Sequence, residues 1–224
     1  MNYQIIIPAR GGSKRFPQKN VSLLGGIPLI SHSILFALEN FPKEKIWINT
    51  DDQLTEEIAG SYGVNITQRP KELASDTSTT AEVLRFQQNI FIDNRIECDA
   101  QILLQATNPF RPKNLIYEAI SLFEDNRRNS LASFTILDKK YGKIQSKYYK
   151  PINYKPGDRI QDIDKNYYEN GLIYITNSKS IINQEIITND VFPLIYNGLE
   201  ALVDIDEPND MIFAEYLLKN NLIL

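Results

Sequence analysis

Cysteine is almost absent from this sequence, which has a single one, Cys98, among 224 residues. A lone cysteine cannot form an internal disulfide, so small disulfide-stapled secreted folds are excluded. A basic surplus is also lacking, because 24 lysines and arginines stand against 28 aspartates and glutamates. The net charge of −4 argues against broad nucleic-acid binding, which usually needs a basic surface. We therefore expect no nucleic-acid partner and a small-molecule ligand in a cytoplasmic protein.

Long apolar runs are missing as well. No stretch approaches the roughly 20 continuous apolar residues that a membrane span requires, and we expect no membrane partner. Residues 1–4 show neither a basic leader nor a cleavage site, so we do not expect a signal peptide. Hydrophobic residues still make up 42% of the chain, which is enough to bury a full core.

Short apolar runs alternate with helical patterns along most of the chain, which predicts βα units and a mostly parallel sheet. The expected strands are Gln4–Pro8, Lys45–Thr50, Val64–Gln68, Asp99–Ala106, Ser130–Leu137, Leu172–Thr176 and Ala201–Ile205. The expected helices are Pro28–Glu39, Leu54–Tyr62, Thr79–Ile92 with its cap within Asp76–Ser78, 112–125 and Glu207–Lys219. We therefore predict one α/β domain over residues 1–224, Rossmann-like, with helices on both faces of the sheet.

Residues 138–168 interrupt this pattern with tyrosines, prolines and charges that follow no clear period. A loop of this length inside a compact domain is usually functional. We expect an insertion that serves as a lid or as a dimer arm, with its tyrosines used for packing or for a subunit contact.

A basic loop with two glycines follows the first expected strand. Residues 8–20 have the sequence Pro-Ala-Arg-Gly-Gly-Ser-Lys-Arg-Phe-Pro-Gln-Lys-Asn, and open α/β sheets bind ligands at the carboxyl ends of their strands. Gly11 and Gly12 let the backbone approach a ligand with its N–H groups turned inward. The four cations of the loop are Arg10, Lys14, Arg15 and Lys19. This combination favours a polyphosphate ligand over an exposed basic turn, although it is neither a Walker loop nor a dinucleotide fingerprint.

Two carboxylates, Asp204 and Asp206, lie two residues apart in the last expected strand. On an extended strand they point to the same side, where a divalent cation would relieve their repulsion. Mg²⁺ prefers one or two carboxylates together with substrate phosphates and water. The alternative, in which Asp206 only begins the last helix, leaves Asp204 without a role. The pattern therefore predicts a site for Mg²⁺ (or Mn²⁺) at Asp204 and Asp206.

These segments, taken in order, resemble the motifs of the CMP-sialic acid synthetases, or N-acylneuraminate cytidylyltransferases, a family that includes legionaminate-type enzymes. The family typically has Ala-Arg-Gly-Gly-Ser-Lys-Gly-(Ile/Leu)-Pro-x-Lys-Asn in the loop, where this chain has Arg15 and Phe16 in place of the glycine and the aliphatic residue. The other segments that match are 69–80, 104–111, 159–162, 168–174 and 203–207. Departures from the family are Asn108 for serine, Ile160 for arginine and Leu202 for serine.

The resemblance implies a nucleotidyltransferase that joins CMP from CTP to an acidic nine-carbon sugar and releases pyrophosphate. The residues that it implies for CTP are Arg10, Gly11, Gly12, Ser13, Asn20, Arg69, Thr77, Ser78 and Thr80. Those that it implies for catalysis are Arg10, Lys14, Lys19 and Asp206. Those that it implies for the sugar are Gln105, Arg159, Gln161, Tyr168 and Asn170.

The resemblance also implies a homodimer, in which the insertion 138–168 would cross to a second subunit and share its active site. Two alternatives remain open at the level of the sequence. One is a cytidylyltransferase for another 3-deoxy-2-ulosonic acid, and the other is a non-catalytic nucleotide-binding regulatory protein. Retention of Lys14, Lys19, Asp204 and Asp206 speaks against the second.

Overall fold

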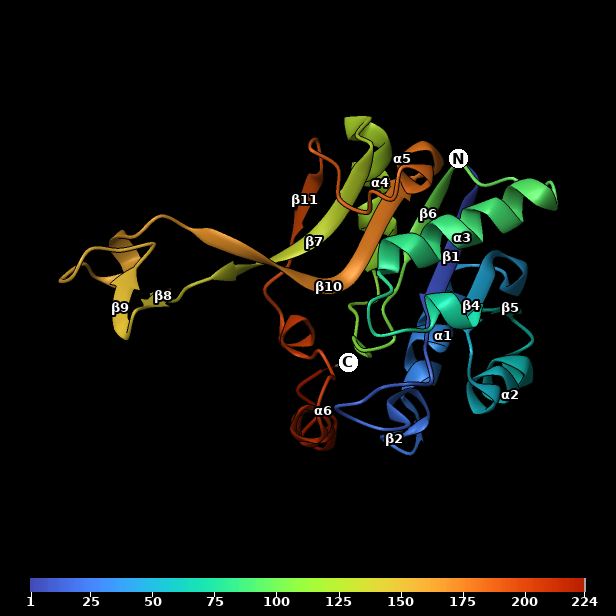
Figure 1. The fold of residues 1–224 in the computed structure, drawn as a ribbon, viewed down its shortest axis with the longest axis horizontal. Helices are drawn as coiled ribbons and strands as arrows, with labels where there is room; N and C mark the ends of the chain where they lie inside the picture. Colours follow the sequence, from blue (N-terminus) through green and yellow to red (C-terminus); the bar gives the residue numbers. More distant parts are fainter. Residues whose placement is uncertain (224) are drawn as a thin grey trace.

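The centre of the computed structural model, which describes residues 1–223, is a seven-stranded sheet (Figure 1). Its strands are β1 (Tyr3–Pro8), β4 (Ile46–Thr50), β5 (Asn65–Gln68), β6 (Ala100–Leu103), β7 (Ser130–Leu137), β10 (Asn166–Asn177) and β11 (Phe192–Ile195). Their order across the sheet is β11-β7-β10-β6-β1-β4-β5. Within residues 1–223, β10 is the one strand of this sheet that runs antiparallel to its neighbours. The prediction of a mostly parallel sheet is confirmed.

Helices cover both faces of this sheet, as predicted. They are α1 (Leu29–Asn40), α2 (Gln53–Tyr62), α3 (Thr80–Asp93), α4 (Leu115–Asn126), α5 (Ser178–Ile182) and α6 (Pro208–Lys219). Successive side chains of a strand point to opposite faces, and in β1 Ile5 and Ile7 pack into the cluster that α1 and α4 share. Ile6 between them packs on the other face, with Leu84 and Phe91 of α3. No helix among residues 1–223 has the length and apolar character needed to cross a membrane.

A small second layer closes the end of the molecule near the basic loop. Strands β2 (Leu23–Leu24) and β3 (Ile27–Pro28) form a hairpin whose turn, Gly25 and Gly26, has positive φ angles. Helix α6 packs against this hairpin through a cluster that contains Leu24 and Leu217. The short 3₁₀ turns of the chain are Lys19–Val21, Lys43–Lys45, Lys71–Leu73, Ile160–Asp162 and Leu199–Leu202.

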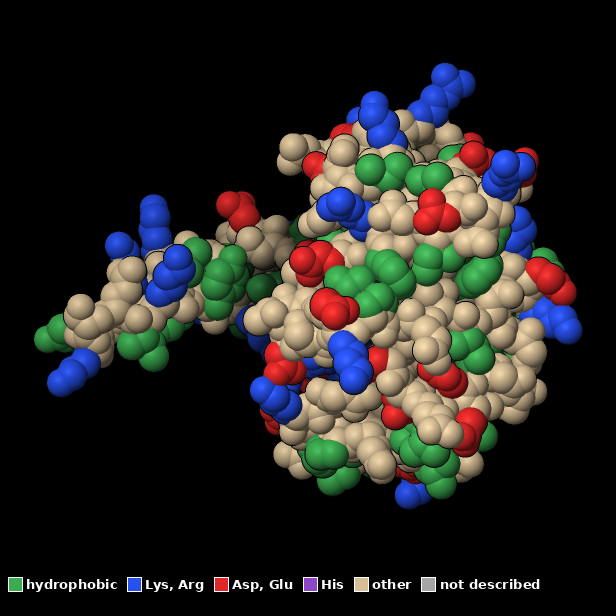
Figure 2. Space-filling view, turned by 45° about the vertical axis from the view of Figure 1, so that its right-hand side comes forward, with side chains coloured by type: hydrophobic (Ala, Val, Ile, Leu, Met, Phe, Trp, Pro, Cys, Tyr) green, Lys and Arg blue, Asp and Glu red, His purple; other side chains and the backbone are tan. Residues whose placement is uncertain are grey.

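The predicted insertion is an arm that projects from the body of the molecule (Figure 1). Its tip is an antiparallel hairpin of β8 (Gly142–Gln145) and β9 (Tyr148–Pro151), which the sequence pattern did not predict. Ile144 and Tyr148 of this hairpin are each 79% exposed. Figure 2 shows hydrophobic side chains along the arm, interspersed with lysine and arginine side chains.

The predicted strand Ala201–Ile205 is wrong. Residues Leu199–Leu202 form a 3₁₀ turn, and the extended residues after it join no sheet. Ile205 donates its N–H to the carbonyl of Thr107 at 2.8 Å instead. The extended residues cannot pair with β6, the strand before Thr107, because β6 already pairs with β1 on one side and with β10 on the other.

The predicted cap of the third helix is also wrong, because the helix begins after Thr79 and not within Asp76–Ser78. Thr79 Oγ1 accepts the N–H of Glu82 at 3.2 Å, and the Glu82 carboxylate accepts the N–H of Thr79 at 2.7 Å. This reciprocal capping box satisfies two helix N–H groups that would otherwise lack partners. Asp76 is thereby left for another use.

Candidate active site

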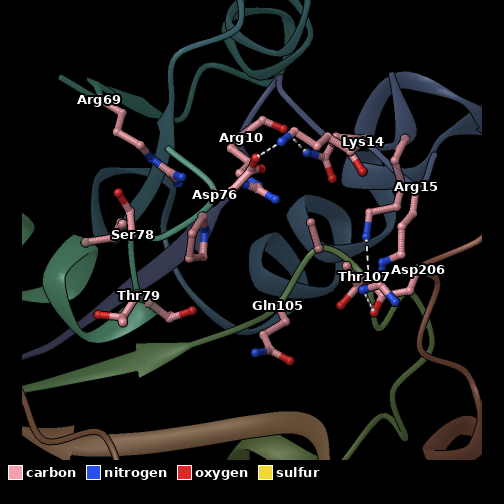
Figure 3. A pocket seen from close by; sticks show the side chains of 17 residues that line it. Arg10, Lys14, Arg15, Arg69, Asp76, Ser78, Thr79, Gln105, Thr107 and Asp206 are labelled. Atoms are coloured by element: carbon pink, nitrogen blue, oxygen red, sulfur yellow. Dashed lines mark hydrogen bonds and ion pairs between the residues drawn. The ribbon is translucent and has the colours of Figure 1, made fainter. Parts of the chain in front are cut away.

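A cavity of about 460 Å³ lies at the carboxyl edge of the sheet, where β1, β5 and β6 end (Figure 3). The loop after β1, the segment before α3 and the segment after β6 line it together. The predicted site residues that line it are Arg10, Ser13, Lys14, Lys19, Asn20, Arg69, Ser78, Thr80, Gln105 and Asp206. Residues distant in the sequence are thus brought into one site, as the order of the motifs predicted.

Two of the loop cations form ion pairs with Asp76, which sequence reasoning missed as a site residue. Arg10 Nη1 lies 3.0 Å from Asp76 Oδ1, and Lys14 contacts the second carboxylate oxygen. The hydrogen bond from Lys14, helped by Arg10, holds the pKa of Asp76 below its ordinary value. Asp76 therefore neutralises two cations that an anionic ligand in the cavity would also attract.

The other two loop cations share Asp206. Lys19, which is only 8% exposed, places Nζ 2.9 Å from Asp206 Oδ1, and Arg15 Nη2 lies 2.6 Å from Oδ2. Partial burial by itself would raise the pKa of Asp206, but Lys19 and Arg15 lower it. Arg15 was not among the predicted site residues, although its place among the four loop cations was a signal for it. The Asn20 side chain fixes the loop by donating to the Arg10 carbonyl at 2.9 Å.

The glycines of the loop do not behave as expected. The N–H of Gly11 donates to Asp51 Oδ1 at 3.0 Å instead of pointing into the cavity. A Cβ atom at Gly11 would lie 2.9 Å from the Cβ of Asp52, so glycine is needed for the close approach of these two loops. Gly12 does not line the cavity either. The prediction of inward N–H groups is therefore corrected for Gly11, and its role is packing of the loop.

Arg69 enters the cavity from the end of β5 and is 8% exposed. Its Nε and Nη2 donate to the side-chain oxygen and the carbonyl of Asn49, at 2.8 and 2.7 Å. Burial lowers the pKa of Arg69 to about 10, so the guanidinium stays charged at neutral pH. In Figure 3 its head points toward the cavity, where its remaining N–H groups can meet a ligand.

The hydroxyl-rich run before α3 is bonded within itself. Ser78 Oγ donates to the carbonyl of Glu72 at 2.9 Å and lies 2.8 Å from Ser75 Oγ. Thr77 Oγ1 lies 3.1 Å from the same Ser75 hydroxyl and does not line the cavity. Ser78 and Thr80 do line it. Thr79 lines it too, but its hydroxyl is bonded to Glu82 in the helix cap, so Ser78 and Thr80 are the candidates of this run for contact with a ligand.

Gln105 forms the far wall of the cavity, and its side chain lies against a bulge in strand β10. The register of β10 on β7 shifts between Glu169 and Tyr174, and Gly171 there has a φ of +78°. A Cβ at Gly171 would lie 2.5 Å from Asn108 Oδ1 and 2.8 Å from Gln105 Oε1, so the side-chain amides of both residues pack closely on the bulge. Asn170, 4% exposed, donates to Thr135 Oγ1 at 3.0 Å and does not line the cavity, so it supports the wall from below.

The remaining residues predicted for the sugar lie in or near the arm. Arg159 holds Asp162 through two hydrogen bonds, of 2.7 and 3.1 Å, and both it and Gln161 are exposed. Tyr168 lies in β10 opposite Thr135. These three residues do not line the cavity of their own chain, and their role in sugar binding stays a prediction.

Asp206 lines the cavity, whereas Asp204, an exposed residue, does not, although the two carboxylates are close enough for their charges to act on each other. The pKa of Asp204 is raised, first by the partial burial of its carboxyl group and then by the negative charge of Asp206, while a hydrogen bond from Thr107 acts in the opposite direction. Two carboxylates that repel each other in this way fit a hard divalent cation. Among residues 1–223 no third His, Cys, Asp or Glu completes a metal-binding group, so the ligand and water would have to supply the rest of the coordination shell.

A basic loop and a hydroxyl-bearing segment around a cavity at the carboxyl edge of a Rossmann-like sheet are the arrangement that nucleotide-binding α/β proteins typically have. Solved structures have the same fold. CMP:2-keto-3-deoxy-manno-octonic acid synthetase complexed with CTP aligns with a TM-score of 0.70 and 18% identity, over 99% of this chain and 100% of that one. 4-diphosphocytidyl-2C-methyl-D-erythritol synthase aligns with a TM-score of 0.68 and 13% identity, over 97% and 100%.

Sequence relatives are closer. The family described as cytidylyltransferase matches residues 4–217. The chain is 34% identical to the CMP-N,N'-diacetyllegionaminic acid synthase of Legionella pneumophila, over 99% of this chain and 98% of the relative. It is 35% identical to the pseudaminic acid cytidylyltransferase of Campylobacter jejuni, over 96% of both. It is 31% identical to the N-acylneuraminate cytidylyltransferase of Streptococcus agalactiae, over 92% of this chain and 51% of that relative.

The chain therefore belongs to the cytidylyltransferase family, and the resemblance to the CMP-sialic acid synthetases is confirmed. It is an enzyme of the nucleotidyltransferase type.

Proposed function

We propose that this chain transfers the CMP group of CTP to the anomeric hydroxyl of a nonulosonic acid, an acidic nine-carbon sugar, and releases pyrophosphate. The observation that carries the proposal is the cavity itself, which joins four loop cations at one end to Gln105 at the other. The legionaminic and pseudaminic acid enzymes, aligned with nearly their whole length, support the acceptor class.

The cations of the basic loop would neutralise the triphosphate. Arg10, Lys14, Arg15 and Lys19 at present face only two carboxylates, and phosphate oxygens offer stronger charge-assisted hydrogen bonds. In phosphoryl-type transfer most of the catalysis comes from positioning and from neutralising the charge that develops on the leaving group. Lys19 is buried and already fixed, so it would orient the reacting phosphate, and the exposed Lys14 would follow the departing pyrophosphate.

The remaining walls would hold the two groups that react. Arg69, with Ser78 and Thr80, would bind the nucleoside, and Gln105 would bind the sugar opposite. Asp204 and Asp206 would hold Mg²⁺ or Mn²⁺, which when bound would neutralise phosphate charge and make the attacking hydroxyl more acidic. Asp206 would have to exchange its contact with Arg15 for such a cation, which frees Arg15 for phosphate.

The arm supports a homodimer as part of the proposal. A two-stranded hairpin is marginally stable alone, and this one exposes Ile144 and Tyr148. A second copy that covers these side chains would also receive Arg159 and Gln161 near its cavity. Light scattering should give twice the monomer mass, and Ile144→Asp should halve it. We also propose a cytoplasmic location, on the basis of the single cysteine.

The experiment is pyrophosphate release with CTP, Mg²⁺ and a panel of acids: an N-acylneuraminate, a legionaminate, a pseudaminate and an eight-carbon 3-deoxy-2-ulosonate. We expect release with CTP and at least one nine-carbon acid, and none with ATP, GTP or UTP. Release with the eight-carbon acid alone would favour that alternative acceptor. Tight CTP binding without release from any acid would favour the non-catalytic alternative.

A further inference from the structure

Arg111 is a buried cation that none of the roles above uses. It follows β6 and is 4% exposed. Its Nε donates to the carbonyl of Leu172 at 2.7 Å, its Nη1 to Ser33 Oγ at 3.0 Å, and its Nη2 to the carbonyl of Gln105 at 2.8 Å. All three acceptors are uncharged, and burial lowers the pKa of Arg111 to about 9.

Burying a guanidinium among uncharged groups lowers the stability of the fold. Removing a charge from water without an opposite charge beside it is strongly unfavourable unless its hydrogen bonds are satisfied. An apolar side chain of similar volume would avoid this, but it could not donate in three directions. The planar fork of arginine can, and lysine cannot reproduce it.

Two of these bonds join β10 to the segment that follows β6, at a place where the pairing of β10 is irregular, and the third bond reaches Ser33 in α1. In β10 the ladder is interrupted between Glu169 and Tyr174, so Leu172 has no ladder partner on β7. Its N–H is taken by Asn170 Oδ1 at 3.2 Å, and its carbonyl is taken by Arg111. On the other side, β6 has ended before Gln105, whose carbonyl Arg111 also binds.

The two backbones that Arg111 holds meet at the Gln105 amide. Gly171 precedes Leu172, and a Cβ there would be 2.5 Å from Asn108 Oδ1 and 2.8 Å from Gln105 Oε1, so both side-chain amides lie against the bulge. A shift of either backbone would therefore move the Gln105 amide within the cavity that it lines. The CTP end is fixed by a separate buried arginine, Arg69 on Asn49, which shares no hydrogen-bond partner with Arg111.

We propose that Arg111 is a positioning residue for the acceptor sugar, because it holds Gln105 and the β10 bulge in the geometry that the sugar acid requires. This inference rests on the proposed function. It assigns the two buried arginines of the site to different substrates: Arg69 serves CTP, and Arg111 serves the acid without touching either substrate.

The test compares Arg111→Lys with the matched variant Arg69→Lys in the full chain. For each we would measure the Kd of CTP by calorimetry and the KM of the best acid by pyrophosphate release. Arg111→Lys should raise the KM of the acid about tenfold or more, since two of its three bonds are lost, and leave the Kd of CTP within about twofold. Arg69→Lys should give the opposite pattern.

An equal rise in both constants, or an unchanged KM, would overturn the assignment and leave Arg111 a general structural residue. If Arg111→Lys does not fold, Ser33→Ala is the second variant: it removes an acceptor of Arg111 and also a hydroxyl that donates to the Gln105 carbonyl at 3.3 Å, so it loosens the same end of the cavity. It should raise the KM of the acid about threefold with CTP binding unchanged. An equal effect on CTP, or no effect, overturns the assignment equally. Wild-type protein is the reference in each case. Its failure to release pyrophosphate with any acid would count against the proposed function itself.

Discussion

The two ends of the cavity hold their cations in opposite ways. At the proposed phosphate end, formed by the basic loop, all four cations pair with the carboxylates of Asp76 or Asp206; Lys14 and Arg15 are exposed, Arg10 is partly so, and Lys19 is buried. At the other end and along the proposed nucleoside wall, the arginines are buried and bonded to carbonyl, amide and hydroxyl oxygens.

The difference separates a part of the cavity that can neutralise charge from a part that keeps a fixed shape. Exposed ion pairs contribute little to stability, so their cations can exchange a carboxylate for a phosphate without disturbing the fold. A buried guanidinium loses its only compensation when it is moved, so it stays in place and fixes the backbone around it. The phosphate end is therefore suited to a charge that changes during a reaction. The end at Gln105 is suited to recognising a ligand by its shape.

The largest effect should come from Asp206, where the two kinds of cation meet. Asp206→Asn removes the charge that Lys19 and Arg15 share and half of the proposed metal site. We expect kcat to fall about 10²-fold or more, as is usual when one charge-stabilising group of an active site is lost. The melting temperature should fall as well, because the buried Lys19 loses its counterion. Pyrophosphate release and thermal unfolding measure the two effects.

Glu207→Gln is the control for Asp206→Asn. Glu207 is exposed and its carboxylate lies 4.0 Å from Arg15, so it lies beside the same basic loop but does not contact Lys19. We expect its kcat to stay within about twofold of wild type. A wild-type kcat for Asp206→Asn at saturating Mg²⁺ would remove Asp206 from the mechanism.

Lys14→Ala tests whether an exposed cation can matter for catalysis without mattering for the fold. We expect a loss of at least about tenfold in kcat, which corresponds to about 1.4 kcal/mol of barrier. The melting temperature should change by less than about 4 °C, because the pair with Asp76 is exposed. Lys71→Ala, an exposed lysine outside the cavity, is the control and should behave as wild type. Full activity of Lys14→Ala would exclude a phosphate contact.

The sequence predicted six of the seven strands of the sheet, since buried strands and amphipathic helices leave a period, but it missed β11, which pairs in parallel with β7, and the short helix α5. The prediction failed where apolar and polar residues alternate for a reason other than a sheet, and where they do not alternate at all. Val203 and Ile205 alternate with polar residues because they pack against α6, in a cluster with Ala214 and Leu217, and not because they lie in a sheet. In the arm, no buried face exists to impose a pattern on the hairpin residues, so β8 and β9 could not be predicted.

The site was predictable where its residues are contiguous. The basic loop and the hydroxyl run carry their chemistry in short motifs, and the fold brings them together at one sheet edge. Partners across the chain could not be predicted in this way. Arg15 and Asp206 are 191 positions apart, and neither segment contains a signal that predicts their pairing. The role of Arg111 was equally hidden, because its acceptors are mostly backbone carbonyls, which any residue provides.

The smallest predicted effect is a gain. Asp76→Asn frees Arg10 and Lys14 from the carboxylate that holds them, so CTP should bind about two- to fivefold more tightly, as suits an exposed pair. Because the competition is electrostatic, the gain should shrink between about 0.05 and 0.5 M salt. Asp162→Asn is the matched control: it breaks another exposed pair, with Arg159 in the arm, and should leave the Kd of CTP unchanged. Weaker CTP binding by Asp76→Asn would mean that the carboxylate organises the cations for phosphate and does not compete with it, and the phosphate end would then be as rigid as the end at Gln105.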